Sequence, residues 1–290
     1  MNRESLLLKT GGQFLVQPIG SQKFFSREQF SDEHREIDQM VREFAQEHIY
    51  PNVHKVDKHN KEVMLELMKE MADLGLFGVD VPEKYGGMDL DKITSAIVIE
   101  NILRGGSASV GVTASVQTSI GSMGIVWFGT DEQKEKYLPG LVAGDTIAAY
   151  ALTEPFAGSD ATSCKTTAML TEDGKYYILN GEKCFISNGT WADIFTVLVQ
   201  VDGDKFSGIL VEKGTPGFEI GAEEKKMGMK GSSTVSLNFT DCKVPAENLL
   251  YEVGKGSAIA FNALNIGRFK LAASCLGGMK VCIEETIRYT

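Results

Sequence analysis

The sequence predicts an α+β fold with several domains: an all-α N-terminal domain, a middle antiparallel β-barrel domain, and the start of a C-terminal α-helical bundle. Apolar residues follow a helical period up to Gly144, which predicts the first domain. Short β-rich runs separated by turn residues follow until about Leu250, and the helical period returns at Ser257. These changes divide the chain into an N-terminal extension (1–30), a helical domain (31–145), a β domain (146–252) and the first helix of an incomplete bundle (253–290).

The composition excludes several classes of protein. Apolar residues make up 43% of the 290 residues and charged residues 23%, as in globular domains, and the net charge of −10 disfavours binding to nucleic acid or to an anionic membrane. No apolar run reaches the roughly 18 residues that a transmembrane helix needs. The five cysteines are odd in number and form no Cys-x-x-Cys pair, so we expect reduced thiols and no metal site.

Start and stop signals place the helices of the first domain. Ser31 is a candidate N-cap, and Pro51 ends or kinks the helix that Ser31 begins. Gly75 is a C-terminal stop for the next helix. The further predicted helices are 61–74, 91–103, 112–127 and a short one that begins with a capping box at 130–133 and stops at Pro139.

Strand signals dominate the second domain. The runs 176–179, 194–199 and 206–211 are rich in β-branched and aromatic residues. Turn residues separate them, as at 172–174 and 202–204. Many short strands with tight turns indicate an antiparallel barrel or sandwich, and we predict the barrel.

The stretch Tyr150–Gly189 contains the candidate site. Its first half is a strand that ends in the Pro/Gly-rich turn Glu154–Asp160, whose N–H groups and hydroxyls suit a phosphate or another anion. In the second half Phe185 precedes Ser187 by two residues, which puts both side chains on one face of a strand. An aromatic ring beside a hydroxyl suits a flat heteroaromatic ring. The two halves together predict a site for one bulky cofactor.

Each part of this pattern also has a purely structural interpretation. The segment Glu154–Ser159 can be an ordinary turn, Phe185 a core aromatic, and Arg268 a solvated or ion-paired arginine. The common nucleotide-binding and hydrolase motifs (G-x-G-x-x-G, Walker A, H-E-x-x-H, G-x-S-x-G) do not occur in the sequence. A Rossmann site, a P-loop, a metalloenzyme and a hydrolase therefore have no support.

Taken in order, the segments of the chain resemble the acyl-CoA dehydrogenase family over nearly its whole length. The matching segments are 128–139, Tyr150–Asp160, Asn180–Gly189, and Lys226–Thr234 with the following 244–250. The run Asn265–Phe269 looks most like the very-long-chain branch of that family. The family fold consists of a helical domain, a β-barrel domain and a four-helix bundle, which agrees with the order of helical and β-rich segments in this sequence.

The resemblance implies bound FAD and the oxidation of a fatty acyl-CoA to the trans-2-enoyl-CoA, as in fatty acid β-oxidation. A carboxylate would take the α-proton while the β-hydrogen leaves as hydride to flavin N5. The resemblance gives Ser187 the role of hydrogen-bond donor to N5 and Phe185 that of a packing wall. The residues it assigns to FAD are Tyr150, Leu152, Thr153, Gly158, Ser159, Phe185, Ile186 and Ser187, and those it assigns to acyl-CoA are Ser159, Asn265 and Arg268.

The catalytic base is not found in these 290 residues. In one branch of the family the base lies on the first bundle helix beside the position that matches Arg268, and this chain has Gly267 there. In the other branches, including the very-long-chain one, the base comes from a later helix. We therefore expect the base beyond Thr290, and we expect this fragment alone to be inactive.

The resemblance further implies electron-transfer flavoprotein as the electron acceptor and a homodimer or homotetramer as the assembly. Two alternatives stay open: an acyl-CoA oxidase that passes electrons to oxygen, and a non-catalytic family member that acts as an assembly or scaffold protein. Met1–Gly20 lacks the pattern of a secretory signal. We expect the bacterial cytoplasm as the location, with the mitochondrial matrix as the alternative.

Overall fold

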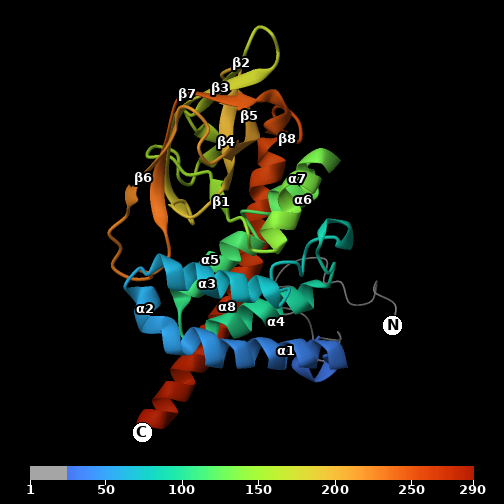
Figure 1. Ribbon diagram of the computed structural model, residues 1–290, viewed down its shortest axis with the longest axis vertical. Coiled ribbons are helices and arrows are strands. Elements are labelled where there is room, and N and C mark those ends of the chain that lie inside the picture. The colour runs from blue at the N-terminus through green and yellow to red at the C-terminus, as the bar shows by residue number, and fades with distance from the viewer. Residues whose placement is uncertain (1–24) are drawn as a thin grey trace, which may run out of the picture.

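The computed structural model describes residues 25–290 and confirms the predicted fold class. A layer of helices lies below a β-sheet, and one long helix, α8 (Gly256–Tyr289), runs past both (Figure 1). Most of the predicted extension, residues 1–24, lies outside the described residues. The exact domain boundaries stay predictions. No helix among residues 25–290 is long and apolar enough to span a bilayer.

The helices before the sheet begin and end largely where the capping signals predict. Ser31 accepts a hydrogen bond from the His34 amide at 3.1 Å, and Gly75 adopts the left-handed conformation (φ +77°) just after α3. Pro51 lies in a short 3₁₀ turn that follows α1 and a π turn. The helices are α1 (Asp32–Phe44), α2 (Val53–Asp57), α3 (Lys61–Asp73), α4 (Lys92–Leu103), α5 (Ala108–Thr118), α6 (Met123–Phe128) and α7 (Asp131–Val142).

Two helix predictions were wrong. The helix predicted for 112–127 is split into α5 and α6, and the buried Gln117 amide stabilises the break by donating to the carbonyls of Leu141 (3.0 Å) and Thr146 (2.9 Å). Pro139 does not stop α7, which continues to Val142. The helix needs only one more short turn after Pro139, and burial of Leu141 offsets the single N–H bond that a proline removes.

The sheet is mixed and open, so the prediction of an antiparallel barrel was wrong in detail. Its order is β6-β7-β3-β2-β4-β5-β8, and β1 pairs with β4. Both β1 and β2 run parallel to β4, whereas the other pairs are antiparallel. The strands are β1 (Ala148–Ala151), β2 (Thr167–Leu170), β3 (Tyr176–Ser187), β4 (Ile194–Val201), β5 (Lys205–Glu212), β6 (Phe218–Glu223), β7 (Thr234–Pro245) and β8 (Leu249–Leu250).

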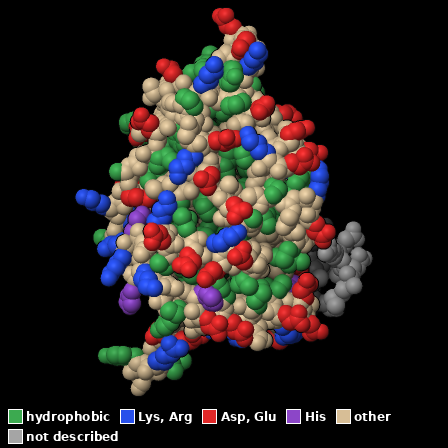
Figure 2. Space-filling model, in the orientation of Figure 1, with side chains coloured by type: hydrophobic (Ala, Val, Ile, Leu, Met, Phe, Trp, Pro, Cys, Tyr) green, Lys and Arg blue, Asp and Glu red, His purple; other side chains and the backbone are tan. Residues whose placement is uncertain are grey.

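Helix α8 contacts both layers and then extends beyond them. Its first part packs against β4, β5 and α6, and its middle packs against α4 and α5. Its C-terminal end stands clear of the other elements (Figure 1) and leaves Ile283, Ile287 and Tyr289 exposed. Hydrophobic side chains gather at this tip, whereas acidic and basic side chains are mixed over the rest of the visible face (Figure 2).

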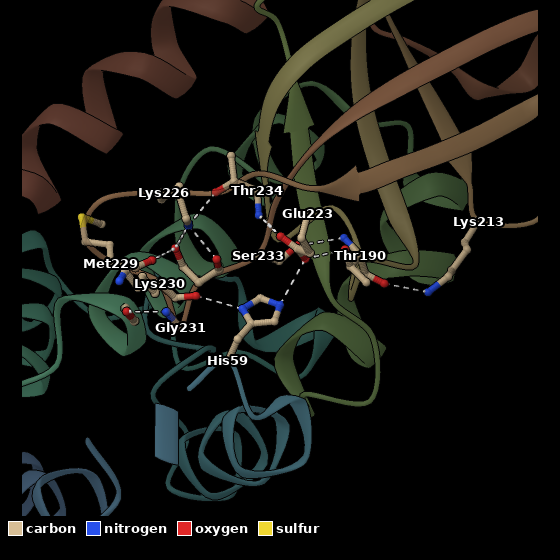
Figure 3. Close-up of polar contacts among 12 residues, drawn as sticks. His59, Thr190, Lys213, Glu223, Lys226, Met229, Lys230, Gly231, Ser233 and Thr234 are labelled. Carbon is tan, nitrogen blue, oxygen red and sulfur yellow. Dashed lines mark hydrogen bonds and ion pairs between the residues drawn. The ribbon is translucent and has the colours of Figure 1, made fainter. Parts of the chain in front are cut away.

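A polar junction joins the helical layer to the sheet below β6 and β7. His59, in the turn between α2 and α3, donates through Nδ1 to the Lys230 carbonyl (2.9 Å), and its Nε2 lies 3.4 Å from Glu223 Oε1. Glu223 also accepts from the Thr190 hydroxyl (2.6 Å) and the Thr234 amide (2.8 Å), as Figure 3 shows. The carboxylate of Glu223 therefore links three separate segments of the chain.

The state of charge of Glu223 makes this junction sensitive to acid. Burial acts to raise the pKa of Glu223, but hydrogen bonds from Thr190 and the Thr234 amide outweigh burial and lower it. A lowered folded-state pKa stabilises the fold above the unfolded-state pKa, and this stabilisation is lost as the pH falls through the folded-state value.

We expect Glu223→Gln to reduce the free energy of unfolding at pH 7 by about 1–3 kcal/mol, because the Thr190 hydroxyl and the Thr234 amide lose a charged acceptor. The variant should also lose less stability than the wild type when the pH is lowered. Urea unfolding at pH 7 and at acidic pH measures both effects. Glu219→Gln, at an exposed position of the same strand, is the control. Parallel pH profiles for wild type and Glu223→Gln would contradict this account.

Candidate functional site

A buried ion pair holds the two halves of the candidate site together. Lys183 of β3 places Nζ 2.8 Å from Glu154 Oε1, and the two side chains are 0% and 4% exposed. The same ammonium donates to the Leu152 carbonyl at 3.1 Å. One lysine on β3 thus fixes both the carboxylate and the backbone of the segment that follows β1.

The remaining oxygen of the Glu154 carboxylate fixes the return of the chain to β2. It accepts from the Lys165 amide at 2.5 Å, while the first oxygen also accepts from the Thr166 amide at 3.0 Å. Burial acts to raise the pKa of Glu154, but these amides and Lys183 outweigh burial and lower it. The carboxylate is therefore ionised and fully occupied, which disqualifies it as a free base.

The turn after Glu154 is rigid at its start and open at its tip. Glu154 and Ala157 exchange two backbone hydrogen bonds of 3.1 Å. Gly158 follows with φ outside the left-handed region, and a Cβ built on it would have no atom within 4 Å. Ser159 is exposed beside it. The fold itself does not require a glycine at this position, so the open space is available for a ligand that approaches the backbone closely.

Strand β3 presents Phe185 and Ser187 beside this turn. The Cys184 amide donates to the Thr153 carbonyl at 2.9 Å, which brings the strand against the turn. The strand is not straight, because a bulge lies between Lys183 and Ile186 and Phe185 has φ +59°. Phe185 is 65% exposed and Ser187 is half-buried, while Ile186 between them is 2% exposed. The bulge interrupts the regular alternation on which the prediction of a common face for Phe185 and Ser187 rests, so that face stays a prediction.

Tyr150 contributes a buried hydroxyl to the same region. Its side chain is 7% exposed, and burial raises the pKa of its hydroxyl. Within the described part of the chain this hydroxyl has no hydrogen-bond partner. Leu152 lies in the same apolar cluster and is also buried, whereas Thr153 is half-buried. An unpaired buried hydroxyl costs free energy, so a ligand that accepts a hydrogen bond would be favoured here.

Helix α8 packs against the loop after β1 and carries Asn265 and Arg268 further along its length. Ala260 and Ala263 of α8 pack in one cluster with Ala157 and Ala161 of the loop after β1. Asn265 and Arg268 follow on the exposed side of the helix, where Arg268 Nη1 donates to Asn265 Oδ1 at 2.9 Å. Helix α8 thus meets the loop after β1 through these alanines, and the roles of Asn265 and Arg268 in binding acyl-CoA stay predictions.

An apolar groove lies between α5 and α8. Its volume is about 730 Å³, within the range of small-molecule pockets. Leu271, one turn beyond Arg268, lies at the α8 wall. The residues that line the groove include Gly111, Val112 and Ser115 of α5 and Leu271, Cys275 and Met279 of α8. The apolar lining of the groove suits a hydrocarbon chain.

Sequence reasoning missed the ion pair of Glu154 and Lys183. The turn was predicted, but Glu154 was treated only as part of it and Lys183 was not singled out. The two residues lie 29 positions apart, and no local pattern marks a strand lysine as fully buried. The groove was also missed, because its walls come from two helices that only the fold brings together.

Comparison with known proteins agrees with this geometry. Residues 31–145 match the N-terminal domain of acyl-CoA dehydrogenases, and residues 149–242 match the middle domain. A probable acyl-CoA dehydrogenase of Bacillus subtilis (strain 168) is 48% identical over 100% of this chain, and the match covers 48% of that protein. The very long-chain specific acyl-CoA dehydrogenase of Macaca fascicularis mitochondria is 41% identical over 87% of this chain and 41% of its own length.

A solved structure gives the same result. The crystal structure of an acyl-CoA dehydrogenase complexed with FAD from Bacillus anthracis superposes with a TM-score of 0.88 at 47% identity, over 92% of this chain and 46% of that one. The chain thus spans about half the length of these relatives. Because two successive domains, the fold and the sequence all agree, the chain belongs to the acyl-CoA dehydrogenase family.

Proposed function

We propose that this chain forms the FAD site and much of the acyl-CoA site of an α,β-dehydrogenase. The reaction would convert a fatty acyl-CoA into the trans-2-enoyl-CoA, in fatty acid β-oxidation. The observation that carries the proposal is the turn after Glu154, which Lys183 holds against the bulged strand β3 and which leaves open space at Gly158 and Phe185 largely exposed. The bacterial cytoplasm is the proposed location.

The residues of the turn and strand fit a flavin. Phe185, largely exposed, would pack against the isoalloxazine ring, and the Ser187 hydroxyl would donate a hydrogen bond at N5. Gly158 would let the backbone approach the pyrophosphate, with Ser159 donating beside it. Tyr150, Leu152, Thr153 and Ile186 would complete the edge of the ring. When bound, FAD supplies the hydride acceptor that the protein itself lacks.

The substrate would lie between α8 and the loop after β1. Arg268, held by Asn265, offers a guanidinium for the phosphates of CoA, and Ser159 offers a hydroxyl. The acyl chain would continue along the groove between α5 and α8. Burial of each methylene there contributes about 0.8 kcal/mol, which favours long chains over short ones.

The base would come from sequence beyond Thr290. Among the described residues at the site, Glu154 is occupied by its ion pair, and α8 has Gly267 beside Arg268. Glu284 lies far along α8 and pairs with Arg104 at 2.6 Å. We therefore propose that residues 1–290 bind the ligands without turnover, and that a chain of the relatives' length is active. Electron-transfer flavoprotein is the proposed acceptor, and a homodimer or homotetramer the proposed assembly.

Gly158→Ala tests the flavin assignment. The added methyl group meets only open space, so the melting temperature of the FAD-free protein should not fall. The methyl group would block close approach of the pyrophosphate, so the dissociation constant of FAD should rise by roughly tenfold. Fluorescence titration with FAD measures this constant. Gly228→Ala, at another open glycine, is the control. Equal FAD affinity in Gly158→Ala and wild type would refute the assignment.

Ser187→Ala tests the reaction in a chain of the relatives' length. Under anaerobic conditions a long-chain acyl-CoA should bleach the flavin of the wild type. The alanine variant should bleach roughly a hundredfold more slowly, because one preorganised donor is lost at the reacting atom, while acyl-CoA affinity changes little. Ser187→Thr keeps the hydroxyl and should restore the rate. Absence of bleaching in the wild type would contradict the proposed function, and unchanged rates in Ser187→Ala would contradict the role of the hydroxyl.

A further inference from the structure

A second buried ion pair, between Asp80 and Lys270, joins α8 to the helical layer. Lys270 Nζ lies 2.7 Å from Asp80 Oδ2, and the side chains are 4% and 3% exposed. The same ammonium donates to the carbonyl of Thr118, the last residue of α5, at 2.8 Å. Asp80 also accepts from the Ser95 hydroxyl at 2.6 Å and pairs with Lys92, both on α4. Lys270 thus connects α8 with the segment before α4 and with the end of α5.

Burying this ion pair costs desolvation free energy, which an apolar contact that holds a helix does not. Lys270 also lines a small cavity together with apolar residues such as Val79, Val98 and Ala114, so its charge is removed from water. Burial lowers the pKa of Lys270, although Asp80 acts in the opposite direction. Apolar residues of similar volume often stabilise such a position equally well or better. The best-attested use of a buried charge pair is to select one register among several that are close in energy.

The contact face of α8 consists largely of small residues, with Ile259 and Ile266 as its larger buried apolar side chains. At Gly267 a Cβ would lie 3.1 Å from Ile120 Cγ2, and at Gly277 a Cβ would lie 2.0 Å from the Glu100 carbonyl oxygen. Small residues let the helices approach closely, but they offer few side chains that interlock. Two further ion pairs follow along α8, Lys280 with Glu100 and Glu284 with Arg104. The polar pairs therefore add directional contacts to a closely packed interface of mostly small residues.

The register of α8 decides which residues face the ligand. Arg268 precedes Lys270 by two positions, and Leu271 follows it directly. Arg268 is exposed at the site edge, whereas Leu271 lines the groove. We infer that Asp80 and Lys270 are positioning residues for acyl-CoA, because their ion pair sets the register of α8 and thereby the place of Arg268 and of the groove wall. This inference rests on the proposed function.

The test compares ligand affinity with stability in the flavin-loaded chain. The probes are S-alkyl-CoA thioethers with 4 and about 16 carbons, which cannot be dehydrogenated as thioesters are, and isothermal titration measures their dissociation constants. The variant Asp80→Asn with Lys270→Met removes both charges and keeps the side-chain volumes. Lys136→Met with Glu212→Gln removes the exposed ion pair between α7 and β5 and is the control for the loss of two opposite charges elsewhere in the chain.

We expect the double variant to bind the long thioether roughly tenfold more weakly, since small misplacements of positioning groups have effects of this order. The preference for the long over the short thioether should shrink, because the groove wall moves together with Arg268. A purely structural role would lower the melting temperature and leave both affinities unchanged, and that result would overturn the inference. If the double variant does not fold, Lys270→Arg, which keeps the charge paired with Asp80 but changes the geometry of the contact, gives the same comparison.

The outcomes separate this inference from the proposed function. A wild-type chain that binds neither thioether would overturn both. A wild-type chain that prefers the long thioether, beside a double variant with the same preference and the same affinities, would overturn only the positioning role. Weaker binding in the double variant with the flavin content and the control unchanged would support the role of the ion pair.

Discussion

The candidate site depends on one buried ion pair, between Glu154 in the turn after β1 and Lys183 on β3. A carboxylate and an ammonium without access to water are costly unless every polar atom has a partner, and here both oxygens and the ammonium are bonded. Removing either partner alone would leave a buried charge, at a cost of about 3–5 kcal/mol. The pair therefore holds the turn at a fixed place against the bulged strand. The exposure of Phe185 and the open space at Gly158 are consequences of that rigid frame.

The same principle recurs where the large parts of the molecule meet. Glu223 joins the sheet to the helical layer through His59, and Asp80 joins that layer to α8 through Lys270. Apolar packing supplies most of the stability in all three regions, since the core clusters extend through the helices and the sheet. Polar contacts add direction and register, which apolar packing alone specifies poorly. A ligand site built from three separate segments needs that specification, because its parts are positioned only by the fold.

Local signals in the sequence predicted the helices and strands, whereas the contacts between these elements became clear only from the fold. The cap at Ser31 and the stop at Gly75 are decided by a few neighbouring residues, so they could be read directly. The parallel direction of β1 and β2 relative to β4 could not be predicted, because the residues of a strand do not indicate whether its partner runs parallel or antiparallel. The prediction that the helix stops at Pro139 was wrong, because burial around this residue outweighs the local rule that a proline ends a helix. The site segments were recognisable through their resemblance to a family, but the ion pairs that hold them join residues 29 and 190 positions apart.

The most direct test of this account is the affinity of the protein for FAD when the central ion pair is replaced by neutral residues. The double variant Glu154→Gln with Lys183→Met keeps the side-chain volumes and leaves no unpaired charge, so the fold should persist by thermal unfolding. The account predicts that the dissociation constant of FAD rises by roughly tenfold or more, because the turn and the strand lose their common anchor. The variant Lys136→Met with Glu212→Gln should bind FAD as the wild type does. A folded central variant with wild-type FAD affinity would contradict the claim that this ion pair frames the site.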